Sequence, residues 1–289
     1  MSVGEADRSG AVRRVLRGIL FANLAVVAVK ILVGLSVNSL AVLGDAVHSS
    51  VDAVNNLFGM IVVRLAAKEP DEEHPYGHGK FETLGALLVV VFLSVTLFEL
   101  LQGALVRLAA GSAPPELSAP VAALLVATLI INIWVVWYET RAGRRLRSEI
   151  LLADAAHTRA DVFITIAVII GLVLSTAGLA WADPVLAIMV ALMVVRIGIQ
   201  IVRRSIPSLV DQAAVDRVAI QHEATQVLGV RDAYDIRSRE AATRRFAELT
   251  IAVDRTENVA RAHEIADVVE ERLRSSLDLH EIVVHVEPC

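Results

Sequence analysis

The sequence predicts a polytopic α-helical membrane domain of six transmembrane helices, followed by a C-terminal cytoplasmic α+β domain. Of the 289 residues, 55% are hydrophobic, whereas soluble domains average about 45–50%. The excess lies in roughly the first two hundred residues, and the remainder carries charges every few positions, as soluble domains do. We therefore expect a cytoplasmic N-terminal tail at 1–14, a six-helix membrane domain at 15–206 and a cytoplasmic domain at 207–289.

Six apolar segments are long enough to cross a bilayer, whose core of about 30 Å requires about 20 residues of helix. They are residues 15–36, 39–65, 81–109, 119–141, 152–177 and 181–203. Basic residues concentrate before the first segment and after the second, fourth and sixth, which places those ends in the cytoplasm by the positive-inside rule. Both termini are then cytoplasmic. The high Ala and Arg content favours a bacterial source, so the expected location is the bacterial inner membrane, in a multi-pass topology.

The C-terminal residues change to the periodicities of a small mixed domain. Amphipathic helices are expected at 212–228 and 257–277, and alternating strands at 230–239, 246–254 and 281–287. The resulting αββαβ order is typical of a ferredoxin-like domain, with a sheet beneath two helices. Small domains with this much exposed strand edge often dimerise, so we expect a homodimer joined through this domain.

Charge and cysteine content argue against a nucleic-acid partner and against sites built from several cysteines. The net charge is −5, which gives no support for a nucleic-acid partner. Cys289 is the single cysteine, so one chain can form neither a disulfide nor a site built from several thiolates.

The second and fifth segments each contain the pattern D-x-x-H-x-x-x-D, at Asp45–Asp52 and Asp154–Asp161. Residues three, four and seven apart share one face of a helix, so each helix presents carboxylates and an imidazole in one stripe. Ionisable groups in a membrane span cost roughly 2.5–3.5 kcal/mol each on insertion scales, so they require partners. Two nitrogen and two oxygen donors suit a tetrahedral Zn²⁺ ion. The predicted metal ligands are His48, Asp52, His157 and Asp161.

The alternative is that these residues only hold two helices together. Interhelical hydrogen bonds in membranes contribute about 0.6 kcal/mol on average, which is too little to explain two complete stripes. For Asp45 and Asp154 two readings stay open, because a carboxylate near a helix start can also cap the first turn.

Together with the H-P-Y-G-H-G-K-F-E loop at 74–82, the six spans and the αββαβ tail, these stripes resemble the cation diffusion facilitator family of metal/proton antiporters. The resemblance covers nearly the whole chain. It implies a transport site at the four predicted ligands, a homodimer joined through the cytoplasmic domain, and an ion pair between Lys80 and Asp211. The histidine at position 48 resembles zinc-preferring members, whereas members with Asp or Asn there accept cadmium, manganese or iron.

The same resemblance implies a second metal site in the loop after the second span, at Asp71, His74 and His78. Pro75 and Gly77 make this segment a turn, so its side chains can converge without helical spacing. The alternative is a solvated acidic loop that binds nothing.

The tail departs from those family members that hold two metal ions there. Their histidines match Tyr234 and Thr250, neither of which is a histidine. The remaining candidate ligands are His263, His285 and Glu287, which suffice for one looser site, formed within a chain or across the dimer. We expect His222 and His280 to be surface residues.

The expected function is therefore efflux of a divalent metal cation, with Zn²⁺/H⁺ antiport favoured and no cofactor beyond the transported ion. The partners are the metal ion, protons and the lipid bilayer. Fe²⁺, Mn²⁺ and Cd²⁺ remain alternative ions, and a metal sensor or assembly scaffold is the alternative that does not transport. The chain is not expected to be an enzyme. A membrane metallopeptidase would need H-E-x-x-H, and the pair at 263–264 is followed by Asp267 instead.

Overall fold

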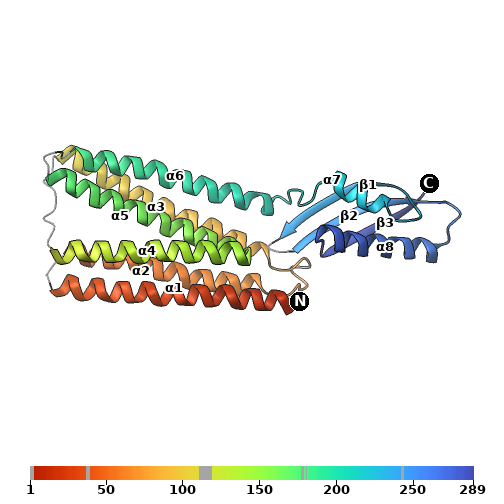
Figure 1. Cartoon of the computed structure of the whole chain (residues 1–289), viewed down its shortest axis with the longest axis horizontal. Helices are drawn as coiled ribbons and strands as arrows, with labels where there is room; N and C mark the ends of the chain where they lie inside the picture. The colour runs from red at the N-terminus through yellow and green to blue at the C-terminus, as the bar shows by residue number, and fades with distance from the viewer. Residues whose placement is uncertain (1–2, 37–39, 111–118, 177–178, 180, 242–243) are drawn as a thin grey trace. The chain divides into compact units, whose positions relative to one another are not determined.

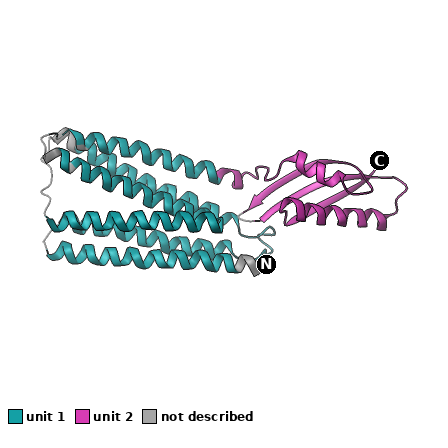
Figure 2. Ribbon diagram, viewed as in Figure 1, with its two compact units in different colours: residues 1–205 teal, residues 206–289 magenta. Residues whose placement is uncertain are grey.

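The computed structural model describes residues 3–36, 40–110, 119–176, 179, 181–241 and 244–289 (Figure 1). The chain forms two compact units, 1–205 and 206–289 (Figure 2). The first unit is helical and the second combines helices with a small sheet, so the predicted fold class is confirmed.

The first unit contains six long helices that lie side by side (Figure 1). Five of them are long and apolar enough to cross a membrane. The remaining one, α5, has 28 residues and carries the ionisable stripe of the fifth predicted span. The six helices are α1 (Val3–Ser36), α2 (Leu40–Ala66), α3 (Lys80–Ala110), α4 (Ala119–Leu146), α5 (Glu149–Thr176) and α6 (Ala182–Leu209).

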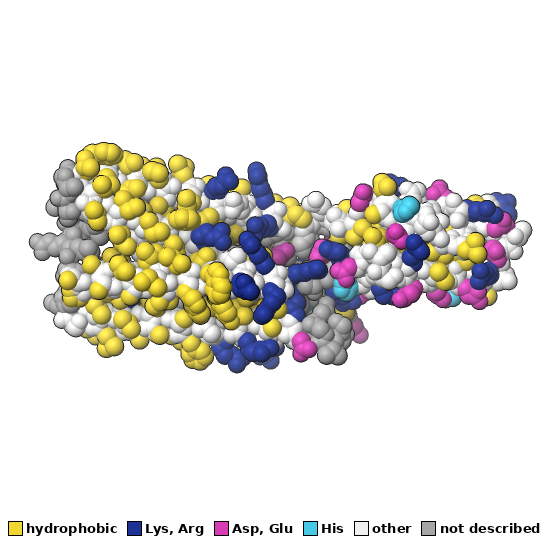
Figure 3. Space-filling view, viewed as in Figure 1, with side chains coloured by type: hydrophobic (Ala, Val, Ile, Leu, Met, Phe, Trp, Pro, Cys, Tyr) yellow, Lys and Arg dark blue, Asp and Glu magenta, His cyan; other side chains and the backbone are white. Residues whose placement is uncertain are grey.

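The outer surface of the helical unit is broadly apolar, and Lys and Arg side chains gather toward one end of it (Figure 3). Leu32, Val47 and Leu192 are each about two-thirds exposed. Inside, Leu16, Leu93 and other apolar side chains from several helices form one core. A soluble protein rarely exposes a continuous apolar surface of this extent, and lipid would cover it in a membrane.

The first helix begins at Val3, so the predicted N-terminal tail at 1–14 is helical from that residue onward. Arg8 accounts for this extension. Its Nε donates to the carbonyl oxygen of Leu146 at 2.7 Å, and its Nη2 lies 3.0 Å from a carboxylate oxygen of Glu82. The buried Ser148 donates to the same carboxylate. These bonds hold the start of α1 against the start of α3 and the turn between α4 and α5.

The second unit has the order αββαβ, as predicted. It consists of α7 (Arg217–Thr225), β1 (Val230–Ala241), β2 (Arg244–Val253), α8 (Val259–Leu277) and β3 (Glu281–Pro288). β2 lies in the middle of the sheet, antiparallel to β1 and parallel to β3. The first helix is shorter than expected because Asp216 caps it, accepting a hydrogen bond from the backbone N–H of Val218.

Both helices of this unit share one core with the sheet. Ile220 of α7, Ile251 of β2 and Leu273 of α8 are fully buried in it. The turn between α7 and β1 depends on Gly229, whose φ is +103°. A Cβ atom at this position would lie 2.6 Å from Cδ1 of Ile265, so the positive φ favours glycine and any larger residue would make Ile265 shift.

Gly229→Ala is expected to destabilise the second unit by about 1–3 kcal/mol, because the side chain adds strain at a positive φ and displaces Ile265. Thermal unfolding of the full-length protein, followed by far-UV circular dichroism, measures the effect. Gly10→Ala is the control, since its Cβ would meet nothing within 4 Å and alanine favours helix. Equal unfolding temperatures for both variants would contradict the proposed role of Gly229.

Candidate metal centre

Three ionisable side chains from α2 and α5 meet inside the helical unit. Asp52, His157 and Asp161 each offer a ligand atom, and these atoms all lie within 4.8 Å of one another. Nε2 of His157 is 3.3 Å from Oδ1 of Asp52 and 3.9 Å from Oδ2 of Asp161. The spacing of four residues places His157 and Asp161 on one face of α5, and α2 brings Asp52 to that face.

Two polar atoms of this cluster have no partner in the part of the chain that the structure describes. They are Nδ1 of His157 and Oδ1 of Asp161, and both are buried. A buried polar atom without a hydrogen bond is costly. Carboxylate and imidazole groups whose acceptor atoms have no hydrogen-bond partner are the groups that bind metal cations in proteins.

His48 lies near this cluster but outside the group of three. It is half-buried on α2, one turn before Asp52, and interacts electrostatically with Asp161. The structure therefore brings together three of the four predicted ligands, while the fourth approaches without joining them.

Asp154 has a different environment from the cluster, although it belongs to the same stripe. It is 4% exposed, and its two carboxylate oxygens accept hydrogen bonds from Nδ2 of Asn55 at 3.0 Å and of Asn56 at 2.6 Å. Asn56 in turn accepts from Asn23 of α1 at 2.7 Å. Asp154 thus joins α5 to α2 rather than capping a helix turn.

Asp45 is engaged by a lysine that our reading of the sequence did not single out. Nζ of Lys30 lies 2.7 Å from Oδ2 of Asp45 and donates to Oγ of Ser49, also at 2.7 Å. Lys30 is buried on α1. A lone lysine in an apolar span is the sequence signal that indicates such a pairing.

Glu139 of α4 is a second buried ionisable residue that sequence reasoning missed. Its side chain is fully buried, and neither carboxylate oxygen meets a hydrogen-bond donor among the described residues. Asp154 is its electrostatic neighbour. The sequence signal was the single acidic residue in the otherwise apolar stretch before the basic end of α4.

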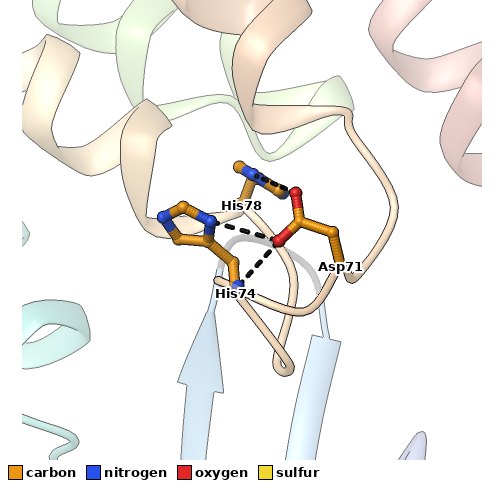
Figure 4. A group of neighbouring side chains, drawn as sticks. All are labelled: Asp71, His74 and His78. Carbon is orange, nitrogen blue, oxygen red and sulfur yellow. Dashed lines mark hydrogen bonds and ion pairs between the residues drawn. The ribbon is translucent and has the colours of Figure 1, made fainter.

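The loop between α2 and α3 forms a second group of potential ligands (Figure 4). Nδ1 of His74 lies 3.3 Å from Oδ1 of Asp71, and Nε2 of His78 lies 3.4 Å from Oδ2 of the same residue. One ligand atom from each residue falls within 4.8 Å of the others. The side chain of His78 is buried, whereas Asp71 is half exposed, so the group opens on one side.

Backbone geometry gives the loop its shape. Gly77 has a φ of +82°, and its N–H donates to the carbonyl oxygen of His74 at 2.9 Å. The N–H of His74 donates to Oδ1 of Asp71 at 2.7 Å, and this bond is the main reason that the pKa of Asp71 lies below its ordinary value. The carboxylate therefore stays ionised at lower pH than a free aspartate does.

The three candidate ligands of the second unit are not gathered in one chain. Nε2 of His285 lies 3.6 Å from Oε1 of Glu287, but His263 points to Asp267 on its own helix at 3.8 Å. All three side chains are half exposed or more. Neither of the metal-ligand groups found among the described residues includes them.

Tyr234 and Thr250 stand beside His285 on neighbouring strands. Thr250 pairs with Tyr234 on one side and with His285 on the other. The Tyr234 hydroxyl donates to Glu287, and this bond raises the pKa of Tyr234 to about 12. The phenol thus occupies one of the carboxylates that a metal ion would need.

The remaining predictions concern surface residues and one ion pair. His222 and His280 are exposed. Asp211 lies 3.7 Å from Nη1 of Arg239 within the second unit. The pairing of Asp211 with Lys80 that the resemblance implies stays a prediction.

Comparison with known proteins covers both units. Residues 16–210 match the family model described as the cation efflux transmembrane domain, and residues 213–289 match the cytoplasmic domain of cation efflux proteins. An uncharacterised transporter of Methanocaldococcus jannaschii is 30% identical over 92% of this chain and 94% of its own length. The cation-efflux pump FieF of Cronobacter sakazakii is 31% identical, over 96% and 92%. A manganese efflux system protein of Bacillus subtilis, MneP, is 27% identical, over 98% of each chain.

The family match spans both units, and its transmembrane part includes both ligand groups of the helical unit. The relatives are transporters that this chain matches along nearly their whole length. The chain is therefore a multi-pass membrane protein that belongs to the cation diffusion facilitator family of divalent metal cation efflux transporters.

Proposed function

We propose that this protein exports Zn²⁺ in exchange for protons, through a site formed by Asp52, His157 and Asp161 with His48 as the fourth ligand. The observation that carries the proposal is the convergence of three ligand atoms within 4.8 Å between α2 and α5. A shift of the His48 side chain toward the cluster would complete a set of two nitrogens and two oxygens, which suits tetrahedral zinc.

Proton exchange follows from the chemistry of these ligands. Histidine must be neutral and aspartate ionised to coordinate a metal, so a metal ion and protons compete for one site. Imidazole exchanges protons near neutral pH. A site that loads metal from the cytoplasm and protons from the opposite side would use the proton gradient to drive export.

We place the protein in the bacterial inner membrane with both termini in the cytoplasm, and expect it to act as a homodimer. The clustering of Lys and Arg toward one end of the helical unit supports this orientation (Figure 3). The match of residues 213–289 to the cytoplasmic domain of cation efflux proteins supports dimerisation through the second unit.

Manganese or iron(II) is the second candidate for the transported ion. The three residues that converge supply two oxygens and one nitrogen, a harder set than the four-ligand site. Carboxylate ligands favour Mn²⁺ relative to imidazole, and one relative is named a manganese efflux protein. The choice between the ions therefore depends on whether His48 binds.

Asp52→Asn and Asp161→Asn should each lower zinc uptake into inverted membrane vesicles by at least about tenfold, because each removes a charged ligand at nearly constant volume. Uptake is measured with a zinc-sensitive dye inside the vesicles. Glu264→Gln, an exposed change on α8, is the control and should leave uptake unchanged. Zinc uptake that survives both aspartate substitutions would rule out this site.

His48→Asp should shift the ion preference from zinc toward manganese, since it replaces a nitrogen donor by an oxygen donor. The ratio of zinc to manganese uptake at equal concentrations measures the shift, and we expect it to fall by about tenfold. An unchanged ratio would show that His48 does not contact the ion.

Zinc uptake should depend on the pH gradient across the vesicle membrane. An acidic interior should accelerate uptake, because protons leaving the vesicle exchange for entering metal, and collapse of the gradient with an ionophore should slow it. Rates at several imposed gradients and constant external pH provide the measurement. Equal rates with and without the gradient would contradict antiport.

The loop group should capture metal before transport. His74→Ala and His78→Ala are expected to raise KM several-fold and to leave kcat within about twofold, because they remove binding that precedes translocation. Glu72→Gln is the matched control, since it removes one negative charge from the same loop and leaves Asp71, His74 and His78 unchanged. A fall in kcat with unchanged KM would contradict the capture role.

A further inference from the structure

A small cavity opens among α3, α4, α5 and α6, and its lining includes no residue of either ligand group. Its volume is about 90 Å³. One water molecule needs roughly 10–15 Å³ on this measure, so the cavity has room for a tetrahedral anion with its first waters. It lies near the C-terminal ends of α4 and α6 and the beginning of α5. This is the basic end of the helical unit.

Three arginines from three different helices line this cavity: Arg144 of α4, Arg159 of α5 and Arg204 of α6. None of their guanidinium groups makes an ion pair or hydrogen bond within the chain segments that the structure describes. Glu149 is the one acidic residue in the lining; it interacts with another group, but its Oε2 is buried and meets no hydrogen-bond partner among the described residues. The charged groups that face the cavity are thus three cations and one anion.

Two hydroxyl groups add hydrogen-bonding capacity to the same cavity. Thr140 and Ser205 are part of the lining. Oγ1 of Thr140 is buried without a hydrogen-bond partner among the described residues, and Ser205 is 1% exposed. A buried hydroxyl that lacks a partner indicates a place for a ligand or an ordered water.

The charge of the cavity decides which ligand it can accept. Like charges repel more strongly where water is scarce, so three arginines make this an unfavourable route for a divalent cation. Guanidinium groups instead bind phosphate with paired hydrogen bonds. Basic pockets between transmembrane helices, on the cytoplasmic side, are also where phosphate headgroups of anionic lipids bind.

We propose that this cavity binds a phosphate group, held by Arg144, Arg159 and Arg204 and carried by either an anionic phospholipid or a soluble phosphate. The inference does not depend on which metal is transported.

The cavity and the transport cluster take different residues of α5. The cavity is lined by Glu149, Leu152, Ala153, Ala156 and Arg159, whereas the cluster takes His157 and Asp161. Ala153 and His157 are four positions apart, so the two sets adjoin on the helix surface. A bound phosphate group would therefore contact α5 beside its metal ligands.

The test uses the purified full-length protein in detergent, free of added metal. Its thermal unfolding temperature is measured with dioctanoyl phosphatidylglycerol, with dioctanoyl phosphatidylcholine and with inorganic phosphate, against chloride at equal ionic strength. Binding only to the folded state raises this temperature by mass action. The variant is Arg144→Gln/Arg159→Gln/Arg204→Gln. The control is Arg141→Gln/Arg145→Gln/Arg203→Gln, which removes the same charge from α4 and α6 outside the cavity.

We expect phosphatidylglycerol to raise the unfolding temperature of the wild type and of the control by several degrees, and to have little effect on the cavity variant. Phosphatidylcholine should be ineffective, because its headgroup carries no net charge. A rise with phosphatidylglycerol alone identifies a lipid as the source, and a rise with inorganic phosphate as well identifies the phosphate group itself. An equal response of the cavity and control variants, or no response of the wild type, would overturn the proposal.

If the triple variant does not fold, Arg144→Gln and Arg204→Gln are tested singly, since both side chains are exposed. Each should reduce the lipid-induced shift by about half or more, because charge-assisted bonds to phosphate are strong. Native mass spectrometry of lipid retained through purification gives an independent reading of the same binding.

Discussion

The cost of placing ionisable side chains inside a membrane-spanning helix governs the arrangement of the helical unit. An uncompensated charge there is expensive, so most of the buried ionisable residues that the structure describes meet a partner on another helix, whereas the carboxylate of Glu139 meets no donor there. Lys30 meets Asp45, Asn55 and Asn56 meet Asp154, and Asp52 meets His157. These contacts fix the order in which α1, α2 and α5 pack, because the lipid-facing apolar surface alone does not distinguish one helix neighbour from another.

The sequence predicted the two units and nearly every element, since hydrophobic length and periodicity are local properties. The first predicted membrane segment begins at residue 15, whereas α1 begins at Val3. The helical state of these first turns depends on Arg8, which bonds Glu82, Leu146 and Arg147. α7 came out shorter than predicted because Asp216 caps it. The bonds of Arg8 join residues 74 or more positions apart, and no local pattern contains them. The cap at Asp216 is local, since it bonds the backbone of Val218.

For the candidate site, spacing identified which residues could share a face but not what each one meets. The two D-x-x-H-x-x-x-D stripes look equivalent in the sequence, yet Asp154 accepts two amide hydrogen bonds while Asp45 pairs with a lysine. The burial of Glu139 was not predicted, because this residue belongs to no motif and its environment depends on how α4 packs. The loop group was easier to predict, because Asp71, His74 and His78 are close in the chain and Gly77 enforces the turn.

The hydrogen bonds from Asn55 and Asn56 to Asp154 have a mechanical consequence. Together with the contact between Asp52 and His157, they fasten α2 to α5 at two levels about one helical turn apart. Two crosslinks at different heights resist both sliding and twisting of α2 against α5. We therefore expect these two helices to move together as one piece when the other helices shift.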